Sequence, residues 1–390
     1  MKASQSFVGV NNVGALLLSA IFLILLWMPT LDSFFSLDKA PWINENRAPA
    51  KFPEVMLSME SLRALPAGLE AYFGDRFGFR KRLIRCEQKW KHELFRESNH
   101  PAVLIGRDGW LYYTGEQMLE HFQGAMTFTR KELAGWQALL EKRRDWLARR
   151  GIRYLLVIVP DKQTIYPEHV PDWLTRTEHQ TKLDQLLAHL KANTTIEVLD
   201  LRPALREAKK TARTYLYTDT HWNMYGAFVA YQALIQALSR QLRDLGEPLP
   251  YAAFEPSLSQ EKGGDLAGLL GGQSMTERDV VRLRPRAPLQ LSEIKADPNI
   301  FVKRPSPYTP PVYTENPTGK YILLSFRDSF SDSWIGLLGH HFKRAVYIWQ
   351  YNWNGQIIAR ERPDVVVDEI VERFFNIADT KKLMRDDGLS

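Results

Sequence analysis

Cysteine is almost absent from this sequence. Cys86 is the single cysteine among 390 residues, so no disulfide can form within the chain. A chain of this length can bury a large core and be stable without disulfides, so this absence does not place it in the cytosol. Cys86 lies in a helical pattern rich in Lys, Arg and Glu, and we expect it to be structural.

Concentrated positive charge is also missing. The formal net charge is +6, but Lys and Arg are spread along the chain with only short runs, such as residues 142–144. A diffuse balance argues against a nucleic-acid partner and is compatible with an anionic polymer or membrane surface. The sequence contains no zinc-ligand spacing and no phosphate-binding glycine loop. His340 and His341 are adjacent on an expected helix and face different directions. We therefore expect no metal, no cofactor and no nucleic acid.

Long hydrophobic runs are limited to the N-terminus. Val13 to Met28 is uncharged and apolar, and the run extends past Pro29 towards Phe35. About 20 apolar residues are needed to span a bilayer. The flanking charges favour a cytoplasmic N-terminus. We expect a short cytoplasmic tail at 1–12 and an uncleaved signal anchor at 13–35. A cleaved signal peptide is the alternative, and it would change only the tethering.

The pattern after the anchor predicts an extension and then an α/β domain. Residues 36–128 read as a linker, helical segments within 56–95 interrupted by a turn at 74–80, and a hairpin at 103–113. Strands and helices then alternate over 129–390, with an irregular insertion of loops and short strands at about 246–318. The expected helices are 129–150, 177–192, 224–245, 332–342 and one at the C-terminus; the expected strands are 152–159, 196–199, 321–326, 345–349 and 365–367. This alternation predicts a doubly wound, mostly parallel sheet.

Polar side chains gather where strands are expected to end. The clusters are Asp161-Lys162, Asp219 with His221, and Asp328-Ser329. In open α/β sheets, sites form in the crevice at the carboxyl ends of the strands. We therefore expect these clusters to meet at one edge of the sheet.

Asp219, His221 and Ser329 could carry acyl-transfer chemistry. In extended backbone, residues i and i+2 point the same way, so Asp219 can orient the His221 ring as a general base. Ser329 follows a strand and precedes a helix, where backbone N–H groups and the helix dipole can stabilise an oxyanion. The alternative is that Asp328 and Ser329 cap that helix and that His221 is a satisfied loop histidine.

Eight short segments of the sequence form a recognisable set, at residues 44–47, 71–73, 78–80, 106–111, 160–162, 165–168, 219–223 and 328–330. Together they resemble the alginate O-acetyltransferase family of periplasmic, SGNH-hydrolase-like proteins. The resemblance implies an SGNH-hydrolase type of fold and assigns the Asp, His and Ser of a catalytic triad to Asp219, His221 and Ser329. The family usually has Gly before the Asp-Ser pair, and this chain has Arg327. That cation could narrow the site, bind an acidic acceptor or turn outward.

Two further residues are candidate substrate contacts. Trp222 could stack on a sugar ring, or it could support the His221 loop. Lys162 could bind an anionic substrate, but pairing with a carboxylate is the ordinary role of such a residue.

The resulting hypothesis is an O-acetyltransferase that modifies an exported polysaccharide through an acetyl-serine intermediate. The family resemblance implies a single-pass bacterial inner-membrane protein with its catalytic domain in the periplasm. It also implies a membrane-bound O-acyltransferase that supplies acetyl groups, a polysaccharide acceptor and other exopolysaccharide assembly proteins as partners. The rivals are an acetylesterase with the same triad and a non-catalytic polysaccharide-binding assembly subunit, in which Arg327 marks a degraded site.

Overall fold

The computed structural model describes residues 11–35, 37, 50–53, 59–80, 82–83, 100–174, 180–271, 275–294 and 310–389. They belong to two compact units, one formed by residues 1–99 with 269–272 and the other by residues 100–268 with 273–390. The larger unit begins near residue 100 and not near 129. The hairpin that we assigned to the N-terminal extension is therefore part of the α/β unit.

The N-terminal unit contains the apolar helix expected from the sequence. Helix α1 (Asn11–Phe35) has 25 residues, which corresponds to about 37 Å of length. Within it, Gly14–Asp32 has a mean hydropathy of 2.2, so by length and composition this stretch can cross a bilayer core of about 30 Å. Helix α2 (Met59–Asp75) ends at the predicted turn. Most of the second predicted helix, from residue 84 on, lies outside the described residues.

A seven-stranded sheet organises the larger unit, in the order β4-β3-β11-β9-β10-β8-β7. The strands are β3 (Arg153–Val159), β4 (Val198–Asp200), β7 (Ser292–Ile294), β8 (Val312–Glu315), β9 (Ile322–Arg327), β10 (Arg344–Trp349) and β11 (Val365–Val371). Strands β4, β3, β11, β9 and β10 are parallel, whereas β8 pairs antiparallel with both β10 and the edge strand β7. The predicted mostly parallel α/β sheet is confirmed.

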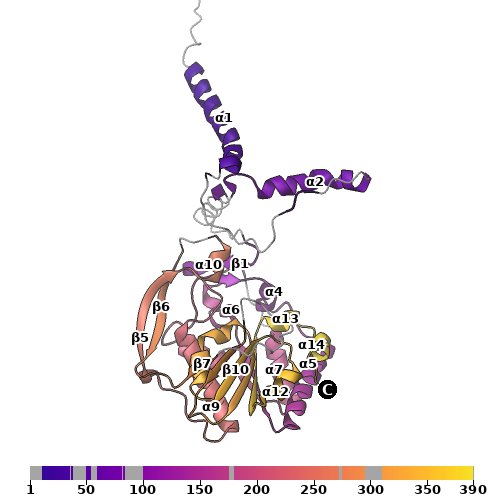
Figure 1. Cartoon of the computed structure of the whole chain (residues 1–390), viewed down its shortest axis with the longest axis vertical. Helices are drawn as coiled ribbons and strands as arrows, with labels where there is room; N and C mark the ends of the chain where they lie inside the picture. The colour runs from indigo at the N-terminus through magenta and orange to yellow at the C-terminus, as the bar shows by residue number, and fades with distance from the viewer. Residues whose placement is uncertain are drawn as a thin grey trace, which may run out of the picture. The chain divides into compact units, whose positions relative to one another are not determined.

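Helices cover both faces of this sheet because its central strands are apolar on both sides. On β3, Leu155, Val157 and Val159 enter one core, and Tyr154, Leu156 and Ile158 enter the other. Each fully buried aliphatic side chain contributes about 1.5–3 kcal/mol. Helix α9 (Met224–Gln241) packs into the first core, and α5 (Arg130–Ala148) and α7 (Lys182–Asn193) into the second (Figure 1).

Capping side chains set the helix starts. Thr129 caps α5 through a capping box with Glu132, as its sequence predicts. The start that we expected for α7, at about 177, is wrong. The helix begins at Lys182, because Thr181 and Asp184 form a capping box at that point. The C-terminal end expected for the helix at 224–245 is also too late, since α9 ends at Gln241.

Three other expectations need correction. The insertion contains a long two-stranded ribbon, β5 (Phe254–Lys262) with β6 (Thr276–Pro285), where we expected loops and short strands (Figure 1). The helix expected at 332–342 is only α11 (Ile335–Gly339), preceded by the short 3₁₀ helix η5 (Ser329–Ser333). Strand β11 continues past residue 367 through two buried carboxylates, Asp368 and Glu369.

Candidate functional site

Ser329 lies two residues after the end of β9, the middle strand of the sheet, at the first position of η5. Asp328 is the N-cap, and its carboxylate accepts a hydrogen bond from Phe330 N–H at 2.9 Å. The strand-to-helix turn is therefore present as predicted. Because η5 and α11 are both short, the macrodipole that we expected behind Ser329 contributes little.

His221 reaches Ser329 from a loop between α8 (Arg202–Ala208) and α9. Its Nε2 lies 2.7 Å from Ser329 Oγ, although the two residues are 108 positions apart in sequence. On the other side of the ring, Nδ1 lies 2.6 Å from Asp219 Oδ1. With the proton on Nδ1 donated to Asp219, Nε2 is left to accept the Ser329 hydroxyl proton. The structure thus brings Asp219, His221 and Ser329 into one hydrogen-bonded chain.

The backbone between Asp219 and His221 is not extended, which corrects our reason for their proximity. The loop bends through residues 217–221 and is closed by a bridge between Tyr215 and Trp222. Asp219 Oδ1 also accepts the His221 backbone N–H at 2.9 Å, as in an Asx turn. A local turn, not strand alternation, therefore brings the carboxylate to the imidazole.

The charges of this pair stabilise each other. Burial opposes ionisation of Asp219, but the hydrogen bond from His221 and the His221 charge together lower the pKa of Asp219. Burial likewise opposes protonation of His221, but the hydrogen bond and charge of Asp219, together with Asp265, leave the His221 pKa raised. A raised pKa makes the imidazole a stronger base for the Ser329 proton.

The segment that connects β5 to β6 packs against Asp219, and sequence reasoning missed this contact. The Asp265 backbone N–H donates to Asp219 Oδ2 at 2.9 Å, and the Asp265 carboxylate accepts the Thr220 N–H at 2.7 Å. A Cβ on Gly264 would lie 2.3 Å from Asp219 Oδ2, so only glycine allows this approach. The available signal was the Gly263-Gly264-Asp265 run within the insertion, since paired glycines often mark close backbone approach.

Glu277 of β6 anchors the preceding part of the loop. Its buried carboxylate accepts the backbone N–H groups of Tyr217 and Thr218 at 2.8 and 2.7 Å, and it forms an ion pair with Arg213 at 2.8 Å. Asp265 and Glu277, both more than 40 residues further along the chain, thus hold the His221 loop in place.

Lys162 supports the same loop through hydrogen bonds to its backbone. Its side chain is buried, and Nζ donates to the backbone carbonyls of Leu216, Tyr217 and Asp219 at 3.1, 3.1 and 2.7 Å. These three bonds use all the ammonium donors. The geometry thus favours neither the substrate contact nor the carboxylate pairing that we considered.

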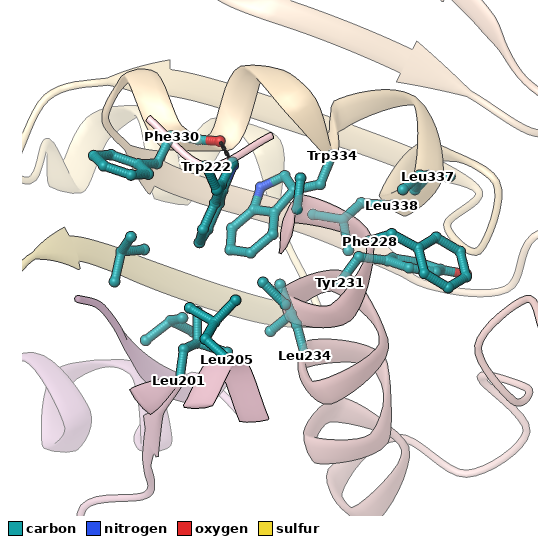
Figure 2. Packing of buried hydrophobic residues seen from close by; sticks show 14 of the residues in the cluster. Leu201, Leu205, Trp222, Phe228, Tyr231, Leu234, Phe330, Trp334, Leu337 and Leu338 are labelled. Atoms are coloured by element: carbon teal, nitrogen blue, oxygen red, sulfur yellow. Dashed lines mark hydrogen bonds between the residues drawn. The ribbon is translucent and has the colours of Figure 1, made fainter. Parts of the chain in front are cut away.

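Trp222 is buried beneath the site and offers no face for sugar stacking. Its Nε1–H donates to the Phe330 carbonyl at 3.1 Å, and its ring packs on Phe330 and Trp334 with both centroid distances at 5.1 Å (Figure 2). Phe330 directly follows Ser329, so this contact joins the His221 loop to the Ser329 turn. Of the two roles that we considered for Trp222, the contacts favour support of the loop.

Arg327 is folded away from solvent and is only 2% exposed. Its Nη1 contacts Asp332 Oδ1 at 2.5 Å and the Asp328 carbonyl at 3.0 Å, and its guanidinium lies 4.8 Å from the Trp349 ring centroid. Because the side chain is buried, little of its guanidinium can be reached by an acidic acceptor. Arg327 instead connects the residues on either side of Ser329.

Asp219, His221 and Asp265 lie close enough together to be considered as metal ligands. The same atoms already form hydrogen bonds: Asp219 Oδ1 with His221 Nδ1, and Asp265 with Thr220. The cluster is thus explained without an ion.

Comparison with known proteins matches part of this chain to one family. Residues 103–300 match the family model described as "SGNH hydrolase-like domain, acetyltransferase AlgX". A protein of Pseudomonas syringae pv. tomato named "Probable alginate O-acetylase AlgJ" is 30% identical over 299 residues, covering 76% of this chain and 67% of the relative. A further relative of that name, from Pseudomonas fluorescens, is 28% identical, and 64% of its length is covered.

A solved structure shares the fold at low sequence identity. The O-acetyltransferase domain of Pseudomonas putida AlgJ aligns with a TM-score of 0.50 and 22% identity, over 73% of this chain and 99% of that domain. This likeness supports the fold alone. The family match covers half of this chain and contains His221, Asp219 and Gly264. The chain therefore belongs to the family of SGNH hydrolase-like acetyltransferase domains typified by AlgX.

Proposed function

We propose that this protein is an O-acetyltransferase that uses Ser329, His221 and Asp219 as a catalytic triad and acts on an exported, alginate-like polysaccharide. The observation that carries the proposal is the continuous hydrogen-bonded chain from Asp219 through His221 to Ser329. The family match and the relatives named alginate O-acetylase support the reaction type and the polymer class.

The first half of the reaction forms an acetyl-serine. His221 Nε2 takes the proton of Ser329 as Oγ attacks the acetyl carbonyl, and Asp219 stabilises the resulting imidazolium. The Phe330 N–H is already bonded to Asp328, so we assign the Ser329 N–H to the oxyanion. The donor's leaving group takes the proton from His221 as the carbon–oxygen bond to the donor breaks.

The second half transfers the acetyl group to the polymer. A sugar hydroxyl attacks the acetyl-serine carbonyl while His221 Nε2 accepts its proton. Collapse of the tetrahedral intermediate breaks the bond to Ser329 Oγ, and His221 returns the proton to that oxygen. The products are the acetylated sugar and the free serine, so no net charge or proton is consumed within the site.

The cellular setting belongs to the same proposal. Helix α1 would anchor the chain in the bacterial inner membrane as a single-pass protein, with the larger unit in the periplasm. A membrane-bound O-acyltransferase would supply the acetyl group, and other exopolysaccharide assembly proteins would act with it.

Transfer can be tested with the full-length protein in detergent. The protein is mixed with 4-nitrophenyl acetate, with and without polyuronate oligosaccharides, and the sugars are examined by mass spectrometry. We expect acetylated oligosaccharide with the wild type and none with Ser329→Ala, while Ser333→Ala in the same turn stays active. Acetate release without acetylated sugar would support an esterase. A protein that neither cleaves the ester nor labels at Ser329 would contradict both enzymatic functions.

A further inference from the structure

Two adjacent carboxylates, Asp368 and Glu369, are fully buried in the middle of the inner strand β11. Burying an ionisable group there is costly unless it is well hydrogen-bonded. Because adjacent residues of a strand face opposite sides of the sheet, the two carboxylates contact different groups. Asp368 has a structural partner, since its Oδ2 accepts from Arg143 at 2.7 Å and from Tyr154 at 3.1 Å.

Glu369 faces the Ser329 turn instead. Its Oε2 accepts the Asp328 backbone N–H and the Ser331 hydroxyl, both at 2.8 Å. These two donors flank Ser329 on either side. One carboxyl oxygen therefore fixes the turn at the residue before the serine and again after it.

The Asp328 carboxylate completes this support. Besides capping Phe330, it accepts hydrogen bonds from Tyr351 Oη at 2.7 Å and from the Val371 N–H at 3.2 Å. Burial, and then the charge of Asp328, raise the pKa of Glu369 well above its usual value. Glu369 Oε1 has no hydrogen-bond partner among the described residues, so Oε2 alone holds the turn.

We propose that Glu369 is a positioning residue that holds the Ser329 turn in line with His221 through its paired bonds to Asp328 and Ser331. The inference rests on the proposed function, because it matters only if Ser329 reacts. A nucleophile displaced by about 1 Å loses roughly a hundredfold in rate. The bonds of Glu369 would prevent such a displacement by tying the turn to β11, an inner strand of the sheet.

Substitutions at position 369 can distinguish a role of Glu369 in positioning Ser329 from a role in simply filling space in the core. Glu369→Gln is isosteric and uncharged, so its carbonyl oxygen can accept both bonds. Glu369→Leu fills a similar volume but accepts none. Asp368→Asn is the matched control, since it alters a buried carboxylate of the same strand that does not contact the turn. Ser331→Ala removes one of the two bonds with little risk to folding.

The readout is the rate at which phenylmethanesulfonyl fluoride modifies Ser329 in the full-length protein, followed by mass spectrometry, with thermal unfolding as the check on folding. We expect Glu369→Gln and Asp368→Asn to react within about threefold of wild type, Glu369→Leu about a hundredfold more slowly, and Ser331→Ala in between. If Glu369→Leu does not fold, a slower Ser331→Ala supports the inference and an unchanged one overturns it.

Two other outcomes would also overturn it, and they are distinguishable. If the wild type is modified at Ser329 and a folded Glu369→Leu reacts equally fast, the positioning role is wrong while the proposed function stands. If the wild type is not modified at Ser329 and transfers no acetyl group, the proposed function fails and the inference fails with it.

Discussion

Gly264→Ala should disable the site by displacing one carboxylate. The added Cβ would lie 2.3 Å from Asp219 Oδ2, 2.4 Å from Asp219 Cβ and 2.7 Å from Asp219 Cγ. Because these contacts involve the base of a short side chain, rotation of the carboxylate alone cannot relieve them. Asp219 must move, and its 2.6 Å bond to His221 Nδ1 lengthens or breaks.

The size of the effect follows from what Asp219 does for the imidazole. Losing the orienting carboxylate of such a triad costs about 10⁴ in kcat, and a shift of about 1 Å costs about 10². We therefore expect Gly264→Ala to lower kcat by between about 10² and 10⁴, which is about 3–5 kcal/mol of barrier. KM for the acetyl donor should change little, since Asp219 acts on the base.

Cleavage of 4-nitrophenyl acetate by the full-length protein in detergent measures this effect. Gly268→Ala is the matched control, because a Cβ at Gly268 in α10 (Asp265–Leu269) meets nothing within 4 Å. Alanine there should leave kcat unchanged. A folded Gly264→Ala variant with wild-type kcat would refute the argument that Asp219 orients His221 from this position.

Three further substitutions test the site. Asp219→Asn should lower kcat by about 10⁴ and, because Asp219 raises the pKa of His221, should move the acid limb of the kcat/KM profile to lower pH; an unchanged limb contradicts this. Lys162→Met leaves three loop carbonyls without their donor and should cost about 1–3 kcal/mol in urea unfolding, with lower kcat. If Lys162→Met were as stable as the wild type but bound oligosaccharide more weakly, the result would instead support a contact between Lys162 and the substrate. Trp222→Phe removes the bond to Phe330 and should cost about 1 kcal/mol of stability without changing KM for oligosaccharide, whereas a large rise in KM would indicate sugar stacking.

The local parts of this structure were predictable because short-range chemistry sets them. The Thr129 cap and the apolar run of β3 define a helix and a strand through neighbours close in sequence. The relation between Asp219 and His221 is also local, although a turn and not an extended strand produces it. These features depend on hydrogen bonds and side-chain periodicity within a few residues, which sequence records directly.

The corrections arise where long-range packing decides. The sequence predicts that strand β11 ends at residue 367, because two carboxylates follow the apolar run. In the structure the strand continues, since Arg143 and the Ser329 turn donate hydrogen bonds to these carboxylates. The sequence predicts loops and short strands in place of the ribbon because its residues show no clear apolar alternation, and most of them are exposed in the structure.

The sequence by itself determined the alternating strands and helices, the apolar N-terminal segment and the residue types of the proposed triad. Only the tertiary structure decided that His221 meets Ser329 across 108 positions, that Gly264 makes room for Asp219, and that Arg327 turns to Asp332. The physical reason is that such contacts follow from how the whole core packs and from which buried polar groups find partners. No window of neighbouring residues contains that information.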